Sequence, residues 1–527
     1  MLDWEILLST QPPAVTTVTH SNNPTDELFI SDTLVGETID AVAEAKKKEL
    51  STLIDHDVYE EVDDVGQDSI SSRWVITEKV DEESQRVTVK ARLCARGFEE
   101  EQNFRTDSPT CSRESVRILL STLASNKWEL SSIDITRAFL QGEPIERTVY
   151  LKPPPEANTD KLWRLKKCLY GLADGPRKWY LKLTGELKRL GCTQHKIDKG
   201  LFYYTLNDKL ESVITCCVDD VAYGNTPLFL SNILNTLKQT FSIGTYNSTA
   251  FKYVGISVSQ NDDYSISVHQ INYINTIQTI PISTSRRSEK LEPVTEDERR
   301  YFRSAIGQLN WAAGISRPDI SFTVCQLSTR VNAATVSDLI EVNKLIKYVQ
   351  TEPLVITFPK LNSDTLHLTL YCDASFKNLQ DGGSQGGHIV FLCDDDDNCC
   401  PIAWSSSRIK RIVHSTLAAE TLALTDGSGT ALYVRSLLEG VVSCREAVSV
   451  LTDNKSLCDT IHSKKQTQDK RLRVDIAGIK EMFDQGQIEI KAVPGKEQLA
   501  DVLTKKGASP HSLLSVLRSG KLYMVSK

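Results

Sequence analysis

The sequence predicts an α+β protein of about three domains, and three observations support this fold class. Short apolar strand-like runs alternate with amphipathic helical stretches, without the regular spacing of repeated strand–helix–strand units. The chain has 527 residues, 40% of them hydrophobic, so it can bury cores in several domains. A new strand pattern starts at Thr365, after a long helical region, and this places a domain boundary near residue 360.

The first part of the chain predicts an arm, a helix and a hairpin. Residues 1–55 are acidic and at first rich in Ser, Thr and Pro, so we expect a largely mobile arm with one helix around Glu37–Leu53. The runs RWVITEKV and RVTVKARLCARGF are typical of the two strands of a hairpin, and the acidic residues Asp81–Ser84 predict the turn between them.

Helical and strand patterns also organise the remaining chain. Residues 112–127 and 179–191 predict amphipathic helices, and the second helix stops at Gly191. Residues 284–300 are polar and charged throughout, which predicts a linker or exposed loop. Helical periodicity then continues to about residue 350. Beyond Thr365, alternating Leu and Cys residues predict one face of a strand, and the acidic run Asp394–Asp397 predicts a solvated loop between strands.

The cysteine pattern and the lack of a long apolar run exclude several classes of protein. Thirteen cysteines occur without CxxC spacing, which argues against a disulfide framework and against a zinc site, so we expect reduced and mostly buried thiols. No run approaches the roughly 18 apolar residues of a membrane span, and the N-terminus lacks the layout of a signal peptide. We therefore expect an intracellular protein that does not enter a membrane.

The net charge of −8 is unevenly distributed. Residues 1–70 hold 16 acidic and three basic residues, which leaves a net charge of +5 for residues 71–527. A mildly basic remainder suits a protein that follows nucleic-acid phosphates, but it suits an ordinary intracellular domain equally well.

Two segments carry acids where apolar strands end. Asp134 closes the strand SSID, and Asp219 with Asp220 interrupts the apolar run VITCCVDDV. Nucleotidyl transfer uses two divalent cations about 3.5–4 Å apart, held by few carboxylates. Adjacent acids between apolar strands are costly unless they lie at a tight turn and bind a cation. A solvated turn is the competing interpretation of the Asp pair, and its apolar flanks disfavour it.

A second set of four acids follows residue 360. Each acid ends a strand or lies near the start of a helix, and the set can form a second two-metal site if the fold brings it together. Without cations the converged carboxylates would repel one another. For each acid alone, a helix N-cap or a turn is the competing interpretation. The four acids are Asp373, Glu420, Asp453 and Asp501.

From roughly Arg73 to Lys505, the chain resembles the reverse transcriptase and ribonuclease H portion of the Pol polyproteins of Ty1/copia-type long-terminal-repeat retrotransposons. The resemblance implies a right-hand polymerase with fingers, palm and thumb, followed by a ribonuclease H-like α/β domain. It rests on the motifs KARLCARGF (90–98), SSIDITRAFLQG (131–142), CLYGLADGPRKWY (168–180), CVDD (217–220), FKYVGISV (251–258), YFRSAIGQLNWAAGISRPDISF (301–322), WSSSRIKRIVHSTLAAE (404–420) and QLADVLTK (498–505).

In the polymerase part, the resemblance implies that Asp134, Asp219 and Asp220 bind two ions of Mg²⁺ or Mn²⁺. Phe139 matches an aromatic steric gate that would collide with a ribose 2′ hydroxyl. The further candidates for nucleotide or template binding are Lys90, Arg92, Arg96, Gly171, Pro176 and Arg177. For the three basic residues before position 100, an exposed basic strand face is the competing interpretation.

In the C-terminal part, the resemblance implies that the four later acids hold a second pair of ions and that water is the nucleophile. It further implies RNA-directed and DNA-directed DNA synthesis, and cleavage of RNA in hybrids that are recognised through their wide minor groove. The implied partners are an RNA template, a DNA primer, the RNA–DNA hybrid and deoxynucleoside triphosphates. The implied location is a cytoplasmic virus-like particle or the nucleus, and the oligomeric state stays open.

Three positions depart from the family's pattern. The chain has Ala173-Asp174 where the family commonly has Lys-Gln, and Cys217 where it commonly has an aromatic residue. It also has residues 492–494, Ala-Val-Pro, where a histidine often precedes the last acid. We expect effects on template binding, on support of the primer end and on product release, respectively, and no departure removes a metal ligand.

The organisation expected from these patterns has five parts. They are an acidic arm (1–60), reverse transcriptase fingers and palm (61–260), a thumb or connection region (261–360), a ribonuclease H-like domain (361–510) and a tail (511–527). Protease, integrase and zinc-knuckle motifs are missing from the sequence, so we expect a fragment of a longer polyprotein.

Two other hypotheses compete with a working enzyme. A catalytically idle relic or a domesticated nucleic-acid-binding protein would keep the same fold, but retention of all seven acids favours the enzyme. A telomerase or intron-type polymerase is disfavoured, because the C-terminal part supplies a nuclease that those classes lack.

Overall fold

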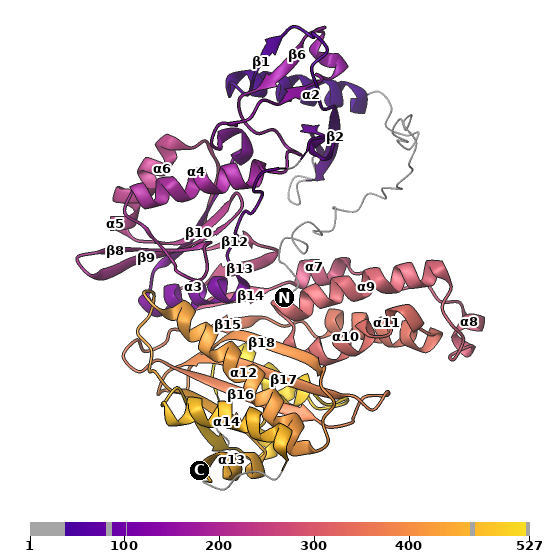
Figure 1. The fold of residues 1–527 in the computed structure, drawn as a ribbon, viewed down its shortest axis with the longest axis vertical. Helices are drawn as coiled ribbons and strands as arrows, with labels where there is room; N and C mark the ends of the chain where they lie inside the picture. Colours follow the sequence, from indigo (N-terminus) through magenta and orange to yellow (C-terminus); the bar gives the residue numbers. More distant parts are fainter. Residues whose placement is uncertain (1–36, 81–86, 102, 464–468, 523–527) are drawn as a thin grey trace. The chain divides into compact units, whose positions relative to one another are not determined.

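The computed structural model describes residues 37–80, 87–101, 103–463 and 469–522 (Figure 1). The chain forms two compact units, each built from several separate segments. The first unit takes segments from residues 1–110, 134–194 and 231–245, and the second takes residues 111–133, 195–230 and 246–527. Helices and sheets are mixed in both units, which confirms the α+β prediction.

In the first unit, a long helix packs on a β-hairpin. Helix α2 (Glu37–Asp55) contacts β3 (Val87–Ala95), which pairs antiparallel with β2 (Ser72–Val80). The predicted helix and hairpin are therefore confirmed, whereas the expected mobile arm up to residue 36 and the turn at Asp81–Ser84 lie outside the described residues. Further elements of this unit include β1 (Tyr59–Val62), β5 (Tyr150–Leu151), β6 (Leu162–Leu165), η2 (Ala138–Gln141), α4 (Gly175–Arg189) and α6 (Asn235–Thr240).

The second unit begins with the predicted helix α3 (Arg113–Asn126). The Ser112 hydroxyl caps it by accepting a hydrogen bond from the amide of Ser115, and Lys127 ends it in the left-handed region. Four strands follow one another side by side in a sheet, in the order β4 (Glu129–Ile135), β10 (Asp220–Asn225), β9 (Lys209–Cys217) and β8 (Leu201–Leu206). A second sheet has the order β12 (Ala250–Tyr253), β13 (Ile256–Gln260), β14 (Ile266–His269) and β15 (Ile356–Phe358).

Helices fill the region that follows. The linker predicted at residues 284–300 is partly wrong, because α8 (Thr284–Ser288) and the start of α9 (Glu296–Ile315) lie within it. Thr295 and Glu298 form a capping box, which gives this polar stretch a helix start. Helices α9, α10 (Ser321–Ser328) and α11 (Val336–Thr351) pack around a shared apolar core (Figure 1).

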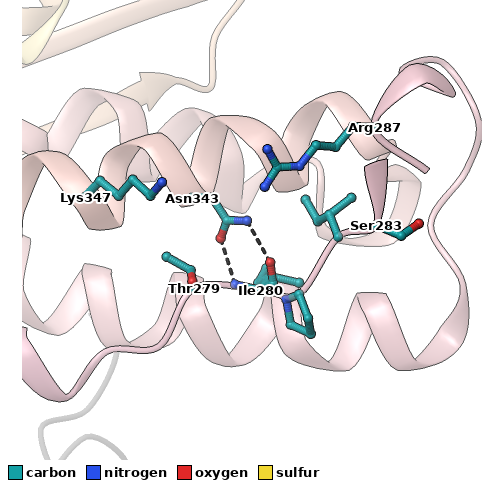
Figure 2. Close-up of a pocket in the computed structure, with 8 residues that line it drawn as sticks. Thr279, Ile280, Ser283, Arg287, Asn343 and Lys347 are labelled. Atoms are coloured by element: carbon teal, nitrogen blue, oxygen red, sulfur yellow. Dashed lines mark hydrogen bonds between the residues drawn. The ribbon is translucent and has the colours of Figure 1, made fainter. Parts of the chain in front are cut away.

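A cavity of about 490 Å³ lies beside α8 and α11. In Figure 2, the side chain of Asn343 holds the backbone of Ile280 in the wall of this cavity. The amide of Ile280 donates to Asn343 Oδ1 at 2.7 Å, and Asn343 Nδ2 donates to the carbonyl of Ile280 at 2.8 Å. This pair of bonds fixes an extended segment against α11.

The last part of the second unit is a five-stranded sheet. Its order is β18 (Cys399–Ile409), β17 (Ser384–Cys393), β16 (His367–Ser375), β19 (Val448–Thr452) and β20 (Ile488–Ala492). The first three strands pair antiparallel, and β16, β19 and β20 pair parallel. Helix α12 (Thr416–Leu438) packs on β16 and β17, and it also contacts α14 (Lys470–Asp484) (Figure 1).

Several local predictions can be compared with this part of the chain. The strand predicted after Thr365 is confirmed as β16, and the acidic run Asp394–Asp397 lies between β17 and β18 as expected. Asp394 itself is buried, because its carboxylate accepts hydrogen bonds from the backbone amides of Asn362 and Asn398. The boundary near residue 360 falls between β15 and β16, which belong to different sheets, and the five-part division stays a prediction.

The cysteines are all free thiols, and only Cys94, Cys325 and Cys444 are not buried, as expected. Among residues 37–80, 87–101, 103–463 and 469–522, no helix is both long and apolar enough to cross a membrane.

Candidate active sites

Three of the four predicted nuclease acids converge at one edge of the five-stranded sheet. In the parallel register, Tyr371 of β16 pairs with Leu451 of β19, and Asp373 and Asp453 each lie two residues further along. Glu420 joins them from the second turn of α12, which packs on β16. The carboxylates of Asp373, Glu420 and Asp453 offer ligand atoms within 4.8 Å of one another. We call these three residues the acidic triad.

Burial changes the protonation of two carboxyl groups of the triad. Burial, with repulsion from the Asp373 and Asp453 carboxylates, raises the pKa of Glu420 to about 9. Burial also raises the pKa of Asp373 to about 6, against the opposing charge of Lys505 and a hydrogen bond from Thr504. Clustered, desolvated carboxylates of this kind are stabilised by a cation, and oxygen ligands suit Mg²⁺ or Mn²⁺. The triad therefore fits a divalent ion.

The fourth predicted acid, Asp501, lies beside the triad but is bonded to a lysine. Asp501 begins η8 (Asp501–Leu503), a single 3₁₀ turn where the sequence predicted a helix. The Lys505 ammonium lies 2.6 Å from Asp501 Oδ1 and 3.2 Å from Asp373 Oδ1. The Thr504 hydroxyl donates a hydrogen bond to Asp373 Oδ2.

Lys505 and Thr504 were not among the predicted site residues. The spacing Asp501–Lys505 is i,i+4, which favours an ion pair on a helical turn, so this signal was present in the sequence. The contact of Thr504 with Asp373 had no such signal, because it joins residues 131 positions apart.

Buried polar contacts hold η8 against the sheet. The Ser406 hydroxyl of β18 donates to the carbonyl of Leu503 at 2.5 Å, and Gln385 of β17 donates to Ser406 at 2.9 Å. Gln498 donates to the carbonyl of Cys372 at 3.0 Å, directly before Asp373. These bonds fix the turn that carries Asp501 relative to the strand that carries Asp373.

The predicted acid pair of the polymerase lies at a hairpin turn. Strands β9 and β10 pair antiparallel, with Cys217 opposite Asp220, so Val218 and Asp219 form the turn. Val218 has a φ of 57°, which a two-residue hairpin turn can require but a β-branched residue rarely adopts. Asp219 is exposed, and Cys217 is buried.

Asp134 is the penultimate residue of β4, the strand next to β10 in the same sheet. It is half-buried and belongs to the first unit, close to Gly244: a Cβ atom there would lie 3.0 Å from its Oδ2 atom. Asp219 and Asp220 belong to the second unit. Metal binding by these three acids stays a prediction.

The nucleotide-binding candidates in the first unit gather around Tyr170. The Phe139 ring meets the Tyr170 ring edge to face at 5.5 Å, and the Arg92 guanidinium lies 5.3 Å from the centre of the same ring. Lys90, Arg92 and Arg96 are exposed and alternate with buried Ala91, Leu93 and Ala95. The basic residues thus form one exposed face, as the competing interpretation also required, and their contacts with phosphate stay predictions.

A close backbone contact places Tyr170 next to β3. The amide of Ala95 donates to the carbonyl of Tyr170 at 2.7 Å. Gly171 has a φ of 90°, and a Cβ there would lie 2.1 Å from the carbonyl oxygen of Ala95, so only glycine fits. Pro176 lies in the first turn of α4, and Arg177 donates to the Asp107 carboxylate at 2.8 Å.

Asp174, which departs from the family's pattern, is buried in an ion cluster. Arg147 Nη2 donates to Asp174 Oδ1 at 3.0 Å and to Glu100 Oε2 at 2.9 Å, and its guanidinium lies 3.9 Å from the centre of the Phe104 ring. Only 4% of the Asp174 side chain is exposed. Its charge is therefore neutralised inside the first unit rather than presented as an exposed negative charge.

The chain is similar to a reverse transcriptase family and to several curated transposon proteins. Residues 56–286 match the family described as reverse transcriptase (RNA-dependent DNA polymerase). The Pol polyprotein of transposon RE1 of Arabidopsis thaliana is 29% identical over 462 residues, which cover 83% of this chain and 30% of that protein. The transposon Ty5-1 protein of Saccharomyces cerevisiae is 26% identical over 298 residues, 53% of this chain and 94% of that protein.

Solved structures agree with the fold. A foamy viral protease–reverse transcriptase in complex with double-stranded DNA has a TM-score of 0.55 at 13% identity, over 92% of this chain and 74% of that one. The chain spans about a third of the longer curated relatives that it matches. The five-stranded sheet with α12 gives its C-terminal part a ribonuclease H-like fold. The chain is thus similar to transposon Pol polyproteins: residues 56–286 match a reverse transcriptase family, and the C-terminal part has a ribonuclease H-like fold.

Proposed function

We propose that the chain is an RNA-directed and DNA-directed DNA polymerase that also cleaves the RNA strand of RNA–DNA hybrids, using two Mg²⁺ or Mn²⁺ ions at each site. The observation that carries the proposal is the convergence of Asp373, Glu420 and Asp453 within 4.8 Å. Two of these carboxylates are buried, carboxylates this close are costly for stability, and binding of divalent ions would offset that cost.

In the nuclease site, the triad and Asp501 would hold the ions. When bound, such ions activate a water molecule and stabilise the charge that develops on the scissile phosphate. The residues of the chain supply the rest: β16 and β19 fix Asp373 and Asp453, α12 brings Glu420 to them, and η8 presents Asp501.

In the polymerase site, Asp134, Asp219 and Asp220 would hold the ions. Asp219 is exposed at the hairpin turn, and this exposure supports contact with a substrate that binds from solution. Phe139, Tyr170 and Arg92 lie together, which supports a deoxynucleoside triphosphate site with an aromatic gate and a cation for phosphate. RNA template and DNA primer are the proposed partners.

Extension of an oligo(dT) primer on poly(rA) with Mg²⁺ or Mn²⁺, and cleavage of a labelled hybrid, test the two activities. We expect Asp219→Asn to abolish extension and to spare RNA cleavage. We expect Glu420→Gln to abolish cleavage and to spare extension, because the nuclease acids lie on and around the five-stranded sheet, whereas the polymerase acids lie at a different sheet.

Absence of both activities from the unmodified chain, with binding of the hybrid retained, would support the nucleic-acid-binding alternative and reject the proposal. Loss of both activities in either single variant would show damage to folding rather than to one site, and circular dichroism would detect it.

A further inference from the structure

The Lys505 side chain contacts the nuclease acids from the solvent side. Its Nζ atom lies 2.6 Å from Asp501 Oδ1 and 3.2 Å from Asp373 Oδ1, and 36% of the side chain is exposed. Thr504 engages the other oxygen of Asp373. An ammonium group and a hydroxyl therefore bind the face of Asp373 that is turned towards η8.

Backbone contacts place the lysine there. The amide of Lys505 donates to the carbonyl of Asp501 at 2.9 Å, so the lysine lies one turn after the acid that it contacts. The bond from Ser406 to Leu503 holds the same turn on the sheet. The fold of η8 thus holds the ammonium at the site, so this cation is part of the chain and does not have to bind from solution.

The acids divide into two halves that share Asp373. One half is the triad, whose oxygens lie close enough to share an ion. The other half is the pair Asp373–Asp501, whose oxygens both contact the ammonium. The spacing of the triad therefore suits an ion, whereas the Asp373–Asp501 half already contacts the Lys505 ammonium.

We propose that Lys505 is a built-in counter-cation that holds the Asp373–Asp501 half when metal is absent and competes with one of the two divalent ions for it. This inference rests on the proposed metal-dependent nuclease. The first ion enters the triad, and the second ion has to displace the ammonium from Asp373 and Asp501. The two ions therefore bind with different affinities, and Lys505 sets the difference.

Removal of the ammonium tests whether Lys505 weakens the binding of the second ion. Lys505→Met keeps an unbranched side chain that is one atom shorter and removes its charge, and Lys505→Arg keeps the charge. Lys506→Met is the matched control, because Lys506 is adjacent and 73% exposed, and lies 3.6 Å from Glu341 instead of the site acids. All variants carry Asp219→Asn, which removes a ligand of the polymerase site.

Binding of Mn²⁺ to the full chain is measured by isothermal titration calorimetry and by electron paramagnetic resonance of free Mn²⁺. We expect Lys505→Met to tighten the weaker binding step about tenfold, the order expected when a unit charge near a divalent ion is removed in a partly screened site. In EDTA, the same variant melts at a lower temperature, because Asp373 and Asp501 lose their counter-charge. Lys505→Arg and Lys506→Met leave the melting temperature in EDTA unchanged.

An unchanged or weaker affinity for Mn²⁺ in Lys505→Met would overturn the inference, because the lysine would then act only by positioning Asp501. Cleavage of a labelled hybrid separates this result from failure of the proposed function. Two binding steps with the expected shift, but without RNA cleavage by the unmodified chain, would reject the nuclease and keep the counter-cation. RNA cleavage by the unmodified chain, with the same affinity for Mn²⁺ in Lys505→Met, would keep the nuclease and reject the counter-cation.

Discussion

Charged side chains are buried in both units, and the charges of their neighbours determine whether the burial stabilises the fold or a bound ion. Asp174 and Glu100 share one guanidinium, so their charges are compensated within the protein. Glu420 shares its surroundings with two other acids, and its pKa rises to about 9. The first arrangement stabilises a fold, whereas the second one stabilises a bound cation.

Arg147→Ala should destabilise the first unit by about 3–5 kcal/mol, the cost of a buried ion pair broken on one side. The substitution leaves the carboxylates of Asp174 and Glu100 without their shared cation, and it removes the contact with Phe104. Urea unfolding followed by tryptophan fluorescence measures this loss.

Arg189→Ala is the matched control for that measurement. Arg189 also donates to a carboxylate, that of Glu186 at 2.8 Å, but 58% of its side chain is exposed. An exposed pair contributes about 0–1 kcal/mol, so the control should remain within that range. Equal losses in the two variants would contradict the role assigned to the buried cluster.

Glu420 predicts a pH dependence of the metal-free chain. Its pKa is about 9 in the folded protein and near 4.5 in an unfolded chain, so between these values the folded state binds a proton that the unfolded state lacks. The free energy of unfolding in EDTA therefore falls as pH rises from about 5 to 9, by roughly 1–3 kcal/mol. Glu420→Gln cannot ionise and should remove most of this slope.

Melting temperatures in EDTA at pH 5 and pH 8.5 check this effect. The advantage of Glu420→Gln over the unmodified chain should be small at pH 5 and large at pH 8.5. Glu489→Gln is the control, because that side chain is 59% exposed on β20 and should not alter the slope. A parallel pH dependence of all three proteins would rule out Glu420 as the cause.

At the scale of elements, the loop around Gly171 connects β3 to the aromatic group at Tyr170. Gly171→Ala should cost roughly 2–3 kcal/mol of stability, because the new Cβ would require β3 and the loop to separate. The displaced loop would move Tyr170 relative to Phe139 and Arg92. The KM for deoxynucleoside triphosphates should therefore rise in primer-extension kinetics.

Gly185→Ala supplies the comparison within the same unit. Gly185 lies in α4, and a Cβ there would meet nothing within 4 Å. Alanine in a helix is favoured over glycine by roughly 0.5–1 kcal/mol, so this variant should be slightly more stable and keep its KM. A KM that stays unchanged in Gly171→Ala as well would show that the loop does not shape the nucleotide site.

The sequence predicted best those elements whose sequence pattern lies within a few neighbouring residues. The hairpin β2–β3, helix α3 and the Asp219 turn each follow from alternation, capping or apolar flanks within a few residues. The start of α9 in a charged stretch was missed, because a capping box can outweigh polar composition.

Long-range contacts explain the remaining differences. The sequence predicted four nuclease acids, and the parallel register of β16 and β19 aligns two of them, which spacing alone could not reveal. The bond from Thr504 to Asp373 and the partner of Asp174 also depend on tertiary structure. The local spacing of Asp501 and Lys505 was visible, but its importance depends on Asp373.

At the scale of the whole molecule, the proposed activities belong to two acid sites on different sheets of one chain. Both sites must approach phosphates, which are negatively charged. Without metal, the ionised acids therefore repel the hybrid that the sites would cleave or extend. Bound ions reverse this repulsion, so hybrid binding and metal binding should be coupled.

A double variant, Asp219→Asn with Glu420→Gln, tests this coupling without catalysis. In EDTA, the double variant should bind a labelled RNA–DNA hybrid at least as tightly as the unmodified chain. Any gain in affinity should come from Asp219→Asn, because Asp219 is exposed, whereas Glu420 is buried and largely protonated at neutral pH. Addition of Mg²⁺ should tighten the unmodified chain more than the double variant, because the variant has lost ligands at both sites. Fluorescence polarisation at two salt concentrations measures both effects. Mg²⁺ responses of equal size in the two proteins would mean that the ions act on the hybrid alone and not through these acids.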